Sequence, residues 1–174
     1  MKLFAIAAIA AIIATPALAG DFGLSGTYKD YDNGAEIYQT TATVTGTVSE
    51  NINIDGTAIW EHNSAVDIYR AEVGATGKID RFFVRAAVGQ TWSSADDFQY
   101  WRVRGGANFD VPLTDGVAVY GQYTEAFGDA VYNPYGVGTK AYWNVNDFRL
   151  SAGVFRDFSD KPKTEYMVGI SRAF

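Results

Sequence analysis

The segment at residues 98–110 reads FQYWRVRGGANFD, and it decides the fold. Its apolar and small residues recur at every second position, while Arg102 and Arg104 occupy the positions between them. Successive side chains of a β-strand point to opposite faces, so this pattern predicts a strand with one apolar and one polar face. The apolar face comprises Trp101, Val103, Gly105, Ala107 and Phe109.

The same alternation repeats along the chain, and turn residues separate its segments. Pro112, Pro134 and Pro162 all fall in connections, where the missing amide donor interrupts no ladder. Tight connections alternate with longer ones, as in an up-and-down antiparallel meander. We expect an all-β barrel of ten strands, with eight as the alternative count. The predicted strands span 22–30, 36–48, 52–61, 66–78, 81–92, 98–110, 116–126, 135–144, 147–158 and 164–174.

Composition excludes several classes of protein. The 174 residues include 14 Lys and Arg against 20 Asp and Glu, which gives a net charge of −6. That balance argues against a nucleic-acid binder with a basic field of its own. The chain has no cysteine, so it holds no disulfide and no cysteine-based metal site. At a mean hydropathy of −0.07, it could occupy a membrane only as a barrel, in which alternate residues meet lipid.

The N-terminus has the pattern of a secretory signal. Lys2 gives a positive start, residues 3–14 form an apolar run, and Ala17-Leu18-Ala19 supplies a small-residue cleavage site. We therefore expect residues 1–19 to be a cleaved signal peptide and residues 20–174 to form the barrel.

Aromatic residues distinguish a transmembrane barrel from a soluble one with an apolar interior. On the apolar face they gather at both strand ends, with small and aliphatic residues between them, as a bilayer requires. From Ile52 to Trp60 the strand rises roughly 26 Å, or about 20 Å of height when tilted, close to the roughly 25 Å apolar band of an outer membrane. One ring comprises Phe22, Phe82, Phe109, Trp143, Phe148 and Phe174; the other comprises Tyr28, Tyr38, Trp60, Tyr69, Trp92, Trp101, Tyr123, Tyr135, Phe158 and Tyr166.

The last strand carries a resemblance to a known class. The pattern Tyr166-x-Val168-x-Ile170-x-x-x-Phe174 resembles the C-terminal strand of bacterial outer-membrane β-barrel proteins, although Arg172 stands where an apolar residue is common. The chain length resembles small porin-like and opacity-type barrels, and no specific family is matched. The resemblance implies a Gram-negative outer membrane with its lipid and lipopolysaccharide, periplasmic termini, and insertion by the barrel assembly machinery through Phe174.

The polar face carries eight basic and six acidic residues, so the sequence predicts a charged interior. They could line a narrow conduit with weak anion preference, or neutralise one another and fill the barrel. Small inward residues such as Gly74 and Gly138 favour open space, and four arginines around Glu72 predict a positive arc. The charged positions are Lys29, Arg70, Lys78, Arg85, Arg102, Arg104, Lys140, Arg149, Asp55, Glu61, Glu72, Asp110, Asp157 and Glu165.

The loops give little sign of chemistry. His62 adjoins Glu61, and Asp96 adjoins Asp97, but adjacent residues of an extended chain point apart, unlike the paired groups that catalysis needs. An enzyme is therefore not expected. Acidic loop residues could bind divalent cations but are more simply solubilising, so we expect no metal and no cofactor.

The sequence thus ranks three functions. The preferred one is a porin-like, narrow passive pore for small polar solutes or ions with weak anion preference. The alternative is a non-conducting structural or surface-interaction barrel, and an outer-membrane enzyme with a site at the rim comes third. No nucleic-acid partner is expected, and the sequence fixes no oligomeric state.

Overall fold

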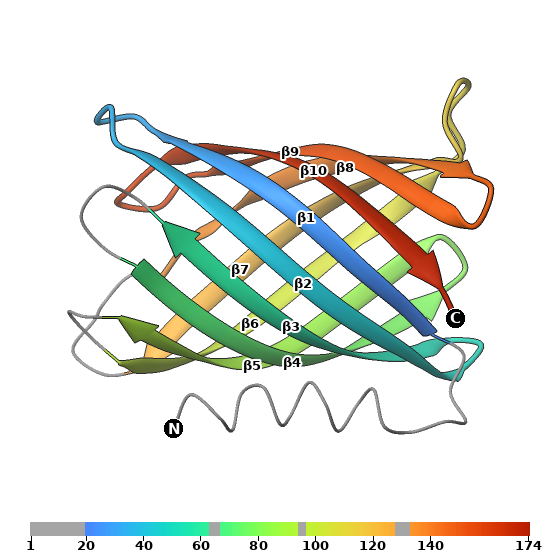
Figure 1. The fold of residues 1–174 in the computed structure, drawn as a ribbon, viewed down its shortest axis with the longest axis horizontal. Coiled ribbons are helices and arrows are strands. Elements are labelled where there is room, and N and C mark those ends of the chain that lie inside the picture. The colour runs from blue at the N-terminus through green and yellow to red at the C-terminus, as the bar shows by residue number, and fades with distance from the viewer. Residues whose placement is uncertain (1–19, 63–66, 94–96, 128–132) are drawn as a thin grey trace.

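In a computed structural model, ten antiparallel strands form one closed barrel (Figure 1). The structure describes residues 20–62, 67–93, 97–127 and 133–174. The strands are β1 (Gly20–Tyr31), β2 (Glu36–Ser49), β3 (Ile52–His62), β4 (Asp67–Ile79), β5 (Phe82–Ser93), β6 (Phe98–Phe109), β7 (Gly116–Phe127), β8 (Tyr135–Val145), β9 (Phe148–Asp157) and β10 (Lys163–Ala173).

Each strand pairs with its neighbours in sequence, and β1 pairs with β10 to close the barrel. The predicted ten-stranded up-and-down barrel is confirmed, and the alternative of eight strands is wrong. Predicted strand bounds agree with the observed ones to within two residues. Beyond β10, Phe174 extends the closure, since its amide donates to the Gly20 carbonyl at 2.9 Å.

The two ends of the barrel differ. We call the end that holds the start of β1 and the end of β10 the turn end, because short connections join the strands there (Figure 1). Asp80 and Asn146 adopt positive φ of 53° and 55° in two of those turns, a conformation that Asp and Asn tolerate. The opposite end, with the longer connections, we call the loop end.

Burial alternates along the strands and separates an outer from an inner face. Val73, Val84, Val103 and Val168 are exposed on the outside, as lipid-facing residues would be. The strand pattern places both predicted aromatic sets on the outer face, one near each end of the barrel. Three charged residues, Glu125, Arg156 and Arg172, also lie on the outer face, each near the end of its strand.

Some predictions fall outside the described residues. These are the signal peptide at 1–19 and the loop residue Asp96. Within the ranges that the structure describes, no helix is long and apolar enough to cross a membrane.

Candidate functional site

A network of ion pairs crosses the inner face of β3 to β6. Arg85 contacts Asp55 at 2.5 Å and Glu72 at 2.6 Å, and Arg102 contacts Glu72 at 3.0 Å. Asp55 and Glu72 are buried, with exposed fractions of 6% and 3%. Buried charges are stable only when they are paired and hydrogen-bonded, and this arrangement meets that condition.

A glycine makes the Arg85 to Asp55 contact possible. The two residues lie on β5 and β3, which are separated by β4. Gly74 of β4 lies between them, and a Cβ there would come within 2.7 Å of the Arg85 guanidinium and 3.0 Å of the Asp55 carboxylate. The missing side chain at residue 74 therefore lets the ion pair reach across a whole strand.

Large inward rings occupy the space that other glycines leave. Tyr100 lies over its cross-strand partner Gly89, and its hydroxyl donates to Glu72 at 3.1 Å. Tyr120 is flanked by Gly106 and Gly138 and stacks on Phe155, with ring centroids 6.0 Å apart. The expectation that small inward residues create open space is therefore wrong at these positions, because neighbouring side chains fill the volume.

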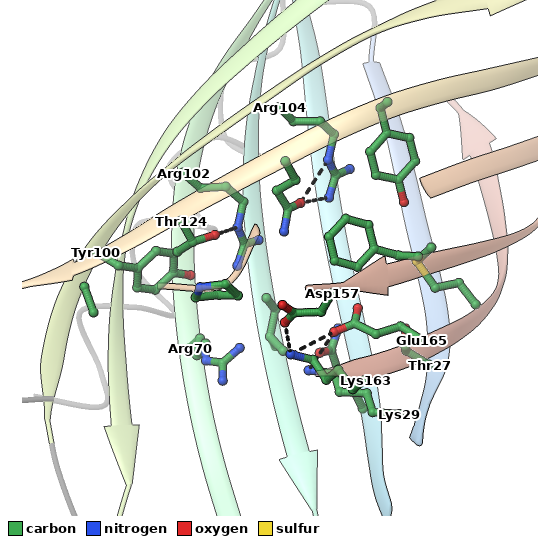
Figure 2. A pocket seen from close by; sticks show the side chains of 18 of the residues that line it. Thr27, Lys29, Arg70, Tyr100, Arg102, Arg104, Thr124, Asp157, Lys163 and Glu165 are labelled. Carbon is green, nitrogen blue, oxygen red and sulfur yellow. Dashed lines mark hydrogen bonds and ion pairs between the residues drawn. The ribbon is translucent and has the colours of Figure 1, made fainter. Parts of the chain in front are cut away.

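A second charged cluster lies towards the loop end, where β1 and β3 end and β10 begins, and Figure 2 shows part of it. Glu61 receives Lys29 at 2.5 Å and Arg70 at 2.8 Å, while Lys163 contacts Asp157 at 2.6 Å. Figure 2 shows Lys163, Asp157 and Glu165 converging within this cluster. The predicted last strand began at residue 164, but Lys163 is the first residue of β10 and is buried inside the barrel.

The predicted positive arc is wrong in its local count of carboxylates. Glu72 was the one carboxylate expected near Arg70, Arg85, Arg102 and Arg104, but Asp55 and Glu61 are also there. Only Arg104 of these four has no carboxylate within 4.0 Å among the described residues; it donates to Gln122 at 3.1 Å and lies over the Tyr120 ring at 4.6 Å.

Three of the remaining predicted cations, Lys78, Lys140 and Arg149, also lack an acidic partner within the described chain. Lys140 lies 5.6 Å from the Tyr142 ring, and Arg149 donates to the Asn144 side chain at 3.1 Å. All three line a cavity of about 430 Å³ at the turn end. Asp110, predicted as a strand residue, lies just beyond β6 and lines the same cavity.

The lumen holds two cavities that share lining side chains. A cavity of about 150 Å³ lies towards the loop end, lined by Lys29, Arg70 and Arg102 among others. Arg104 and Tyr120 line this cavity and also the cavity at the turn end. These two side chains therefore lie where the two cavities adjoin, and we call them the dividing layer.

The described part of the rim brings one histidine and one carboxylate together. The His62 ring lies 2.8 Å from Asp67, while the adjacent Glu61 points into the barrel, as alternation predicts. The hydrogen bond from Arg156 lowers the pKa of the Asp32 carboxyl, which lies in a loop connection. No group of three or more His, Cys, Asp or Glu side chains placed to hold a metal occurs within the described ranges.

Solved structures of outer-membrane β-barrels resemble this fold. The KdgM porin in complex with disordered oligogalacturonate has a TM-score of 0.50 at 11% identity, over 88% of this chain and 99% of that chain. The beta domain of the Bordetella autotransporter BrkA has a TM-score of 0.51 at 8% identity, over 90% and 100%. The fold is that of an outer-membrane β-barrel. No protein-family model and no curated protein matches the sequence.

Sequence reasoning missed the large aromatic rings that pack inside the lumen. It counted inward charges but assigned no role to Tyr100, Tyr120 or Phe155. The signal was present in the pairing, because each of these rings faces a glycine on a neighbouring strand. A register aligned from the predicted turns would have brought each large residue opposite a small one.

Proposed function

We propose that this chain is a porin-like protein of the bacterial outer membrane, a narrow passive pore for small polar solutes or ions with weak anion preference. Residues 1–19 direct its export, and Phe174 presents the last strand to the barrel assembly machinery. Its outer face contacts lipid and lipopolysaccharide. The proposal assigns no catalytic step and no cofactor.

The observation that carries the proposal is the division of the lumen. Cavities enter from both ends, and Arg104 and Tyr120 line both of them. Arg104 has no ion-pair partner within the described residues and is held by one amide, Gln122, and one ring. A side chain held by neutral groups rearranges at lower cost than one in a buried ion pair.

The direction of selectivity follows from charge. Near the dividing layer, Asp55 and Glu72 neutralise Arg85 and Arg102, and Arg104 remains as excess positive charge. At the turn end, Lys140 and Arg149 add to it. A confined positive lumen favours anions, with screening over about 8 Å at physiological salt.

Single-channel recording in a planar bilayer tests this function. We expect a small, steady conductance in potassium chloride and, under a salt gradient, a reversal potential displaced towards that of chloride. A cation-selective reversal potential would contradict the predicted preference. Silence from a correctly folded barrel would contradict the pore itself.

A non-conducting structural barrel is the second candidate, and one observation favours it. The network of Arg85, Asp55, Glu72, Arg102 and Tyr100 is fully connected and buried on one side of the lumen. Satisfied buried networks rigidify an interior. Under this alternative, the wild type and a variant without the Arg104 side chain would both be silent.

A further inference from the structure

The turn-end half of the lumen holds more positive charge than its carboxylates neutralise. Two cavities of about 430 and 210 Å³ meet there, because both are lined by Lys140, Tyr142 and Arg149. Arg104 lines the larger one. All these side chains point inward from β6, β8 and β9, away from the outer face.

Four cations line this space without an ion pair to a carboxylate of the described residues, and they are Lys78, Arg104, Lys140 and Arg149. No carboxylate of the described residues lies within 4.0 Å of Arg104, Lys140 or Arg149, in contrast to Lys29, Arg70, Arg85, Arg102 and Lys163, which are all ion-paired in the same barrel. Their contacts within the described chain are neutral: Gln122 for Arg104, Asn144 for Arg149, and the Tyr142 ring for Lys140.

The acidic residues of this region do not serve as ion-pair partners for these cations. Asp110 and Asp115 line the larger cavity and Asp21 the smaller, but none forms an ion pair with these cations. Asp115 instead accepts a hydrogen bond from the Asn144 backbone amide. A barrel that only needed to fill its interior would neutralise these charges, as it does elsewhere in the lumen.

We propose that Arg104, Lys140 and Arg149 form a binding site for a soluble oxyanion, a small solute that bears a phosphate or carboxylate group and enters from the turn end. Guanidinium groups match such oxygens with paired donors, and the Lys140 ammonium adds a point charge. Tyr120 and Tyr142 line the same cavity, and a tyrosine hydroxyl can donate to such a solute. The oxyanion is not the headgroup of a lipid, since the site lies inside the barrel.

This inference names the solute class of the proposed pore, yet its test does not require conduction. Inorganic phosphate is titrated into the folded full-length barrel in zwitterionic micelles at pH 7.5 and constant ionic strength, with backbone amide NMR as readout. We expect saturable shifts at residues 116–122 and 138–144, and no saturation with chloride. Loss of saturation in a variant combining Lys140→Gln and Arg149→Gln would support the site.

The control is Arg81→Gln, which removes one positive charge at the same end of the barrel. Arg81 lies in a turn with a half-exposed side chain and lines neither cavity. It should leave phosphate affinity unchanged, whereas Lys140→Gln alone should weaken it at least tenfold. Equal effects of the two substitutions would overturn the site and indicate general surface attraction.

Folding and function are separated by two further readouts. Removing an unpaired inward cation should not lower the urea midpoint of the barrel. A lower midpoint for Lys140→Gln would show that Lys140 has a structural role and would contradict the proposal. Binding of phosphate by a barrel that conducts nothing would retain the site and reject the pore. Conduction without saturable phosphate binding would retain the pore and reject the site.

Discussion

Glu72 is the residue on which the inner network depends. Its carboxylate receives Arg85 at 2.6 Å, Arg102 at 3.0 Å and the Tyr100 hydroxyl at 3.1 Å, and it is almost fully buried. Two guanidinium groups share this one carboxylate, and Asp55 supplies the second negative charge. Removing Glu72 would leave more buried positive charge than negative.

Glu72→Gln should therefore lower the free energy of unfolding by about 3–5 kcal/mol, the usual effect of breaking a buried ion pair from one side. Equilibrium unfolding in urea, followed by tryptophan fluorescence in lipid, measures it. The matched control is Asp32→Asn, which breaks an exposed pair with Arg156 and should change stability little. Similar losses in the two variants would contradict the role of burial.

Gly89 tests whether the inward rings are tightly packed. A Cβ at this position would overlap the ring and hydroxyl of Tyr100. Gly89→Ala should destabilise the barrel by about 1–3 kcal/mol, as overpacking does, and should disturb the Tyr100 hydroxyl bond to Glu72. Gly26→Ala is the control, since nothing lies within 4 Å of a Cβ there. An equal urea midpoint for both variants would show that Tyr100 moves freely.

At the scale of the element, β6 shows how one strand serves two environments. Val103 is exposed on the outside, while its neighbours Arg102 and Arg104 face the network and the dividing layer. A shift of register by one residue would exchange the two sets. The outer apolar face and the inner charges therefore fix the register together.

Val103→Arg should cost about 2–4 kcal/mol if the outer face lies in a bilayer, because Val103 is near the middle of β6. Reversible unfolding from lipid vesicles gives this value. Leu113→Arg provides the comparison, since Leu113 lies in a turn and is 96% exposed. A barrel surrounded by water would tolerate both substitutions equally.

The last strand carries the prediction about assembly. Phe174 follows β10, pairs with Gly20 through two backbone hydrogen bonds, and exposes its ring on the outside. Phe174→Ala should reduce the amount of heat-modifiable, folded barrel in the outer membrane, because the terminal aromatic is lost. Phe148→Ala removes another ring near the same end. If both substitutions reduced the amount of folded barrel equally, the loss would come from the belt of aromatic residues around the barrel and not from the terminal residue.

For the molecule as a whole, the central question is how its two cavities communicate. Arg104 borders both, and Arg102 lies beside it on the same face, where it donates to Thr124 at 3.1 Å. The lumen therefore narrows where two guanidinium groups and the Tyr120 ring converge. The width of the pore and the sign of its ion selectivity therefore depend on the same side chains.

Replacing both Arg102 and Arg104 by Ala should raise single-channel conductance severalfold and shift selectivity towards cations. The substitution removes bulk and two positive charges, and it leaves Glu72 paired only with Arg85. Reversal potentials under a salt gradient measure the shift. A silent wild type with a conducting variant would identify the arginines as the closure, and two silent proteins would reject the pore.

Much of the candidate site could be read from the sequence one strand at a time. Alternation gave the inward direction of Glu72, Arg85 and Lys140, since side-chain direction follows from position along a strand. It placed Glu72 among four arginines but did not give the pairing of Arg85 with Asp55. The predicted last strand left out Lys163 because this residue follows Pro162, whereas pairing with Asp157 extends β10 to include it.

The sequence by itself determined the strands, their number, and which face of each is apolar, because these depend on local alternation and turn residues. Tertiary structure alone decided which charges meet. Asp55 and Arg85 pair across an intervening strand because closure and register bring them to either side of Gly74. The unpaired state of Arg104, Lys140 and Arg149 was decided in the same way. Distances between strands depend on the curvature and stagger of the closed sheet, which no single segment encodes.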